Sequence, residues 1–80
     1  PLTVISPFTS NLQVYLTVPD NGDAVFQLFD HKGIRVRQVR RFLVSGTNHV
    51  SLETETLPAG SYLLQVAQGQ KTWVRQVIRH

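Results

Sequence analysis

The chain has 80 residues, with 8 Lys plus Arg against 5 Asp plus Glu, a formal net charge of +3, and 41% hydrophobic residues. This is a globular composition, and the length suits one domain with one core. No apolar run approaches the roughly 20 residues of a membrane helix, and nothing resembles a signal peptide. The absence of Cys excludes a disulfide framework and a thiolate zinc site. Because the chain starts at Pro1 and contains no Met, we expect a single domain, residues 1–80, cut from a longer protein.

Apolar and polar residues alternate in residues 12–18, which is the period of a half-buried β-strand. Pro19 lacks the ladder donor and ends this strand. Asn21 and Gly22 form a pair that tolerates positive φ at both centres of a hairpin turn. We therefore expect residues 24–28 to return as the hairpin partner of residues 12–18.

A second turn is predicted at residues 30–33. Asp30 can accept backbone N–H groups, and Gly33 can adopt the left-handed conformation that closes a longer hairpin loop. Alternation resumes at Ile34 and Val36, but its phase slips by one residue at Val39. Either a β-bulge or a strand that leaves one sheet for the other would absorb the slip.

The block Phe42-Leu43-Val44 is apolar throughout, and we assign Phe42 to the core. Residues 46–48 break the chain before an apolar alternation at Val50 and Leu52. Leu57-Pro58-Ala59-Gly60 predicts a tight turn in which Gly60 is free to become left-handed.

The last part of the chain alternates at Tyr62, Leu64 and Val66, turns at residues 68–70, and ends in a strand over residues 71–79. No apolar residues keep a helical period of 3.6. The pattern therefore predicts an all-β fold, a small antiparallel Ig-like β-sandwich of about seven strands. The residues in phase on their strands form the predicted core: Leu12, Val14, Leu16, Phe26, Leu28, Val36, Val50, Leu52, Tyr62, Leu64 and Val66.

Few residues suggest chemistry. Glu53 and Glu55 would share one face of a strand, as a glycosidase pair or a Ca²⁺ site requires, but no third acid lies near and a solvated strand end is the simpler reading. His31, His49 and His80 lack metal-ligand spacing. No hydrolase signature surrounds any Ser or Thr. We expect no enzyme, no catalytic residue, no metal and no cofactor.

Basic residues are numerous at Arg35, Arg37, Arg40 and Arg41, and again at Arg75 and Arg79. Aromatic partners for stacking nucleic-acid bases are few, so we expect no nucleic-acid partner. Outward strand positions commonly carry Arg for solubility and to protect sheet edges. An anionic partner such as a glycan, lipopolysaccharide or an acidic peptide is the alternative.

Three segments in order resemble a known family. Residues 24–33 (AVFQLFDHKG) resemble a strand that ends "LYDxxGR", residues 57–66 (LPAGSYLLQV) a "LPAGxYxLxV" hairpin, and residues 76–79 (QVIR) a last strand near "KVVK". Residues 46–52 resemble the middle strand of the same family. This family is the type A C-terminal sorting domain of type IX secretion in Bacteroidota. The chain departs from the pattern at residues 4–8, where Val-Ile-Ser-Pro-Phe replaces Tyr-Pro-Asn-Pro-Phe, and at Ile34 and Gln76, where the family usually has a basic residue.

The resemblance implies a secretion signal. Such a domain follows an N-terminal cargo domain, is recognised in the periplasm by an outer-membrane shuttle, and directs the cargo across the outer membrane without inserting into it. A sortase-like peptidase then removes the domain, and the cargo is released or attached to the cell surface. The turn residues that the local sequence patterns predict are Asn21, Gly22, Asp30, Gly33 and Gly60. The residues implied in recognition by the translocon are Pro58, Gly60, Tyr62, Gln76, Val77, Ile78 and Arg79.

A carbohydrate-binding or spacer module of a surface glycanase would have the same fold. That function requires an exposed aromatic platform, for which the sequence offers only Tyr15, Tyr62 and Trp73. We expect Tyr62 to be buried, because it alternates in phase with core residues.

Overall fold

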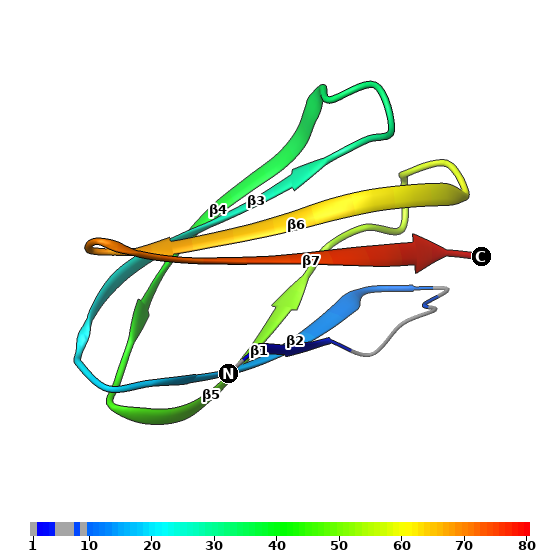
Figure 1. Cartoon of the computed structure of the whole chain (residues 1–80). Helices are drawn as coiled ribbons and strands as arrows, with labels where there is room; N and C mark the ends of the chain where they lie inside the picture. The colour runs from blue at the N-terminus through cyan, green and yellow to red at the C-terminus, as the bar shows by residue number, and fades with distance from the viewer. Residues whose placement is uncertain (1, 5–7, 9) are drawn as a thin grey trace.

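The computed structural model describes residues 2–4, 8 and 10–80, and these residues form seven strands and no helix (Figure 1). The strands are β1 (Leu2–Val4), β2 (Leu12–Val18), β3 (Gly22–Phe29), β4 (Arg35–Leu43), β5 (Gly46–Leu52), β6 (Gly60–Gln68) and β7 (Lys71–Arg79). Within the described part of the chain, no helix is long and apolar enough to cross a membrane. The predicted N-terminal motif at residues 4–8 lies largely outside the described residues.

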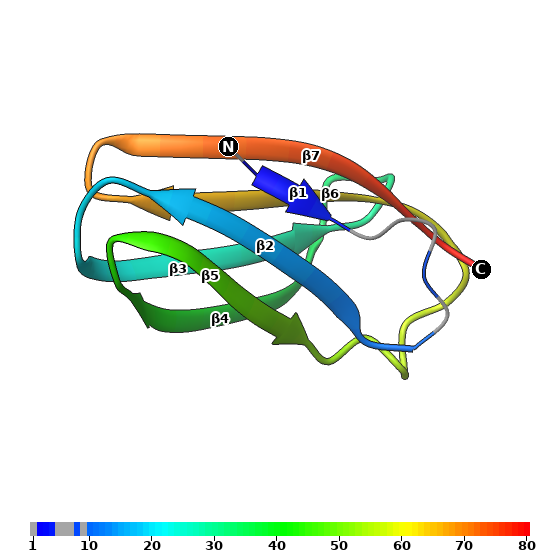
Figure 2. The same ribbon diagram turned by 90° about the horizontal axis from the view of Figure 1, so that it is seen from below.

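The strands form two antiparallel sheets that face each other. One sheet has three strands in the order β1-β2-β5, and the other has four in the order β4-β3-β6-β7. Figure 2 shows the three-stranded sheet lying across the four-stranded one. The predicted small Ig-like β-sandwich is confirmed.

The core lies between the sheets and is filled by the inward side chains of both. Every predicted core residue is buried except Val36, which is half-buried and packs against the cluster. Leu2, Phe8, Val18, Ala24, Leu43, Leu57 and Val77 are also buried. Phe42, which we assigned to the core, is 63% exposed. That assignment is wrong because an uninterrupted strand turns neighbouring side chains to opposite faces, and Leu43 takes the inward position.

A β-bulge in β4 causes the slip in the apolar alternation, so the strand does not leave one sheet for the other. Leu28 lies opposite Arg37 and Phe29 lies opposite Arg35, so Val36 is the extra residue. The strand continues in one sheet to Leu43. The bulge changes which side chains point inward, and it therefore places Val39 and Leu43 on the core side.

The hairpin predicted at Asn21 and Gly22 is wrong, because β2 and β3 belong to different sheets. No described residue other than Gly has a positive φ, so Asn21 does not adopt the conformation of that hairpin turn. Instead, the Asn21 Oδ1 atom accepts a 2.7 Å hydrogen bond from the Ser45 backbone N–H in the β4–β5 connection, which also crosses between the sheets. The Asn-Gly pair indicates local backbone freedom only, and it does not specify which strands pair: β2 pairs with β1 and β5, whereas β3 pairs with β4 and β6.

The β3–β4 hairpin forms as predicted. The Asp30 carbonyl accepts from the Gly33 N–H, the Asp30 Oδ1 atom accepts from the N–H groups of Lys32 (2.9 Å) and Ile34 (3.0 Å), and Gly33 has a φ of 83°. The turn predicted at residues 57–60 is displaced. The hydrogen-bonded turn is at residues 54–57, where the Leu57 N–H donates to the Thr54 carbonyl. Gly60 begins β6 with a φ of 150°.

Candidate recognition surface

The residues expected to contact the translocon gather at one end of the β6–β7 hairpin, next to the C-terminus (Figure 1). Gly60 lies opposite Arg79, and Tyr62 lies opposite Val77. Pro58 lies two residues before the start of β6. Segments separated by about fifteen residues in sequence therefore form one continuous corner of the sandwich, because the antiparallel register joins the start of β6 to the end of β7.

Burial divides these residues into two groups. The side chains of Tyr62 and Val77 are buried in the core and cannot contact a partner. Pro58, Gly60, Gln76 and Ile78 are exposed, and Arg79 is half-buried. Tyr62 and Val77 therefore hold this corner in place, whereas the other five residues remain accessible at its surface.

The Tyr62 hydroxyl donates a hydrogen bond to the Pro58 carbonyl oxygen. Bonding of a buried Tyr to the backbone a few residues upstream resembles the tyrosine corner of Ig-like sandwiches. The bond satisfies the only polar atom of the Tyr62 side chain and fixes the bend that follows Leu57.

Arg79 is held by the segment that joins β5 to β6. Its Nε atom donates to the Leu57 carbonyl at 2.8 Å, and its Nη2 atom donates to the Glu55 carbonyl at 3.0 Å. The guanidinium also lies over the ring of buried Phe8, 5.9 Å from its centroid. Arg79 therefore ties the last strand to the 53–57 connection and to the N-terminal segment.

A second arginine holds the same connection from the opposite edge of the four-stranded sheet. The Arg37 Nε atom donates to the Glu53 carbonyl at 3.1 Å, and Nη2 donates to the Thr56 hydroxyl. The side chain of Thr54 is fully buried and donates to the Ser10 carbonyl. Sequence reasoning did not identify Arg37 or Thr54, because no local signal shows that these contacts form.

Exposed apolar side chains lie on the outer face of the four-stranded sheet. Phe29 and Leu63 are cross-strand neighbours, and Val74 and Ile78 lie on the same face of β7. Leu63, Val74 and Ile78 are each 40–45% exposed. Sequence reasoning missed these exposed apolar side chains. The run Tyr62-Leu63-Leu64 could have indicated them, because three consecutive apolar residues on a strand place apolar side chains on both of its faces.

The basic residues do not form one patch. Arg35, Arg37, Arg40 and Arg41 lie on β4, and Lys71, Arg75 and Arg79 lie on β7, the strand at the opposite edge of the sheet. The four arginines of β4 favour the interpretation of edge protection for that strand. A nucleic-acid reader would need these residues together on one face with aromatic partners.

The remaining candidate residues, the two glutamates and the histidines, do not come together in a site. Glu53 and Glu55 lie in a connection instead of on a strand. Among the residues that the structure describes, no three His, Asp or Glu side chains are placed to hold a metal ion.

The three aromatic candidates for a sugar platform lie apart. Tyr15 stacks on His49, with 4.7 Å between ring centroids, on the outer face of the three-stranded sheet. Tyr62 is buried, as expected, and Trp73 is half-buried on β7.

One carboxyl has a perturbed pKa. The hydrogen bond from the Ile34 backbone N–H lowers the pKa of Asp30 below its ordinary value of 3.8, and the bond from the Lys32 N–H acts in the same direction. These bonds belong to the β3–β4 turn, whose Asp30 and His31 line a hollow together with Tyr62 and Gln76. The shift is therefore a property of the turn.

Comparison with known proteins identifies the family. The family model described as "Secretion system C-terminal sorting domain" matches residues 6–80. No curated protein matches the chain. This family is not an enzyme family, and its members are signals of type IX secretion. A match over nearly the whole length, on a seven-strand sandwich that carries two of the family's motifs (residues 57–66 and 76–79) at one corner, shows that the chain belongs to the family of type IX secretion C-terminal sorting domains.

Proposed function

We propose that an outer-membrane shuttle recognises this domain in the periplasm and carries an N-terminal cargo domain across the outer membrane. A sortase-like peptidase then removes the domain, and the cargo is released or attached to the cell surface. The family supports the coarser part of this proposal, which is export across the outer membrane to the surface or medium.

The observation that carries the proposal is the gathering of exposed motif residues at one corner. Gly60 lies opposite Arg79 and diagonal to Ile78, Gln76 lies opposite Leu63 on the same hairpin, and Pro58 lies two residues before β6. The bond from Tyr62 to Pro58 and the bonds from Arg79 to the 53–57 connection hold this corner rigid. A preorganised surface loses less conformational entropy on binding, and this favours a recognition role.

A fusion of the 80 residues behind a periplasmic reporter tests the proposal in a bacterium with a type IX system. The wild-type fusion is expected at the cell surface, and a shorter reporter lacking the domain is expected after processing. Ile78→Glu places a charge in the exposed corner and should hold the reporter in the periplasm.

Val44→Glu is the matched control, because Val44 is similarly exposed (52% against 45% for Ile78) but lies in the β4–β5 connection. The control should be delivered as the wild type is. Thermal melts of both variants separate recognition from folding. Retention of the wild-type fusion, or normal delivery of a folded Ile78→Glu fusion, would contradict the proposal.

A further inference from the structure

The backbone of β7 presents hydrogen-bonding groups on the side away from β6. Gln68 and Lys71 pair directly across the two-residue turn, so alternate residues from Lys71 onward exchange backbone bonds with β6. The N–H and C=O groups of Thr72, Val74 and Gln76 therefore point away from β6. Because β7 is the last strand of its sheet, these groups form an edge.

One end of this edge already pairs with the backbone of Phe8. The Phe8 N–H donates to the Ile78 carbonyl at 2.9 Å, and the His80 N–H donates to the Phe8 carbonyl at 2.9 Å, in a parallel bridge at Arg79. The edge of β7 is thus competent to pair with an incoming strand. At residues 72–76 no backbone partner from outside the sheet occurs among the described residues. We call residues 72–76 the open edge.

The opposite edge of the same sheet is protected by contrast. β4 carries the bulge at Val36 and four arginines in seven positions, both of which oppose pairing with another strand. The register of β7 against β6 runs without a shift from Lys71 to Arg79. The open edge is therefore regular where the other edge is not.

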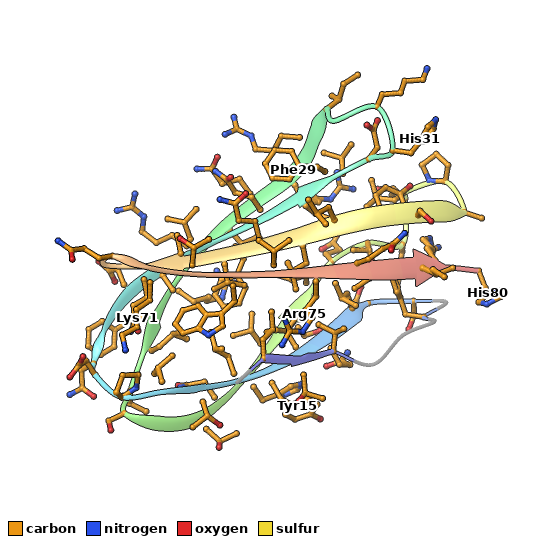
Figure 3. All side chains as sticks on the ribbon, viewed as in Figure 1. Tyr15, Phe29, His31, Lys71, Arg75 and His80 are labelled. Carbon is orange, nitrogen blue, oxygen red and sulfur yellow. The ribbon has the colours of Figure 1, made fainter. Side chains whose placement is uncertain are left out.

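Cations line one side of the open edge. Lys71 and Arg75 are exposed and share the side of β7 that faces the three-stranded sheet, as Figure 3 shows. The Arg75 Nη1 atom donates only to the carbonyl of its neighbour Val74, and no carboxylate pairs with Lys71 or Arg75 within the described part of the chain. Between the start of β7 and residues 17–19 lies an open hollow of about 560 Å³, with Trp73 in its wall.

We propose that the open edge binds an extended segment of a partner protein by strand addition, with acidic residues of the segment facing Lys71 and Arg75 and an apolar side chain packed in the hollow beside Trp73. Main-chain bonds to Thr72, Val74 and Gln76 would supply the pairing, and the two cations would select the charge of the incoming strand. This inference rests on the proposed function, in which the partner is a component of the secretion machinery.

A second copy of this chain fits the edge poorly. Antiparallel pairing of two β7 strands would place Lys71 and Arg75 of both copies on the same side of the joined sheet. Like charges on neighbouring strands are destabilising. The cationic edge therefore favours a partner with acidic residues.

Synthetic peptides test the edge directly on the 80-residue domain. The probe is a ten-residue peptide of alternating Glu and Thr or Val, and its matched control has Lys in place of each Glu. In ¹H–¹⁵N NMR titrations the Glu peptide should shift the amides of Thr72, Val74 and Gln76 and slow their hydrogen exchange at least tenfold. The double variant Lys71→Glu with Arg75→Glu should reverse the preference between the two peptides.

Val74→Pro removes one outward N–H and leaves the β6 pairing intact, because proline is tolerated on the solvent side of an edge strand. Val74→Pro should weaken binding of the Glu peptide at least tenfold, and the control Val74→Thr should leave this binding unchanged. Equal binding of the two peptides, no change in these amides, or self-association through them without peptide would each overturn the inference.

The surface-delivery assay separates this inference from the proposed function. A folded Val74→Pro fusion should be delivered less efficiently than the Val74→Thr fusion. If Val74→Pro is delivered as well as wild type, the open edge is not used and the inference fails while the proposed function stands. If the wild-type fusion itself is not delivered, the proposed function fails.

Discussion

The Nε atom of Arg79 donates a 2.8 Å hydrogen bond to the carbonyl oxygen of Leu57, joining the last strand to the segment that precedes β6. A terminal strand ordinarily frays, and the sequence alone suggests that the last two residues can be removed at little cost. The contacts of Arg79 lead us to expect a larger cost, because its guanidinium donates to two carbonyls and lies over buried Phe8. The C-terminal residues are part of the fold.

Arg79→Ala should therefore lower the free energy of unfolding by about 1–3 kcal/mol, since hydrogen bonds from a charged donor to carbonyls are lost. Arg75→Ala is the matched control on the same side of the same strand, because its guanidinium bonds only to the adjacent carbonyl. It should change stability by less than about 0.5 kcal/mol. Urea denaturation of both variants measures the difference, and equal losses would show that the Arg79 bonds contribute nothing.

Phe26 and Leu64 are buried at the centre of the core. Truncating either to Ala should cost about 2–5 kcal/mol through lost burial and the cavity left behind. For a domain of this size, each kcal/mol lowers the melting temperature by roughly 4–8 °C. Val44→Ala, in an exposed position, should leave the midpoint nearly unchanged, and midpoints near wild type for both core variants would contradict the assigned interior.

The two turn glycines should respond differently to Asn. Gly33 has a φ of 83° with no atom within 4 Å of an added Cβ, so the cost there is backbone strain alone. Gly33→Val should lose roughly 1–2 kcal/mol and Gly33→Asn distinctly less, because Asn tolerates the left-handed region. Gly60 has a φ of 150°, where Asn has no advantage, so Val and Asn should be equally unfavourable. Thermal melts of the four variants test this, and a benefit of Asn at both positions would be inconsistent with these turn geometries.

Asp30 makes the β3–β4 turn sensitive to acid. Its pKa is lowered in the folded state, chiefly by the Ile34 N–H, so its charged form stabilises the fold above the ordinary value of 3.8 and this contribution is lost as the pH falls through the lower folded value. Asp30→Asn keeps an acceptor oxygen but no charge. It should be less stable than wild type at pH 7, and the difference should vanish at low pH. A difference that is constant with pH would exclude the carboxylate as its source.

Much of the fold follows from the sequence because alternation on a strand is a local property. Residues 12–18 and 60–68 show a two-residue period, and both are strands whose inward side chains fill the core. The turn at Asp30 and Gly33 is equally local, since an acceptor and a left-handed residue three positions apart suffice to close it. The ordered motifs also indicated the family, which the match over residues 6–80 confirms.

Tertiary structure alone decided which strands pair and which motif residues are accessible. Asn21 and Gly22 permit a hairpin, but the chain crosses to the other sheet there, where β3 pairs with the distant strand β6 instead of with β2. Phe42 and Leu43 are equally apolar in sequence, and only the bulge at Val36 determines which of them points inward. From the sequence alone, Arg79 is expected to be an exposed terminal charge. In the fold it contacts Leu57 and Phe8, which are distant in sequence, and these contacts anchor the last strand. Local pattern specifies the strands, whereas contacts between distant segments specify the sheet order, the buried set and the exposed corner.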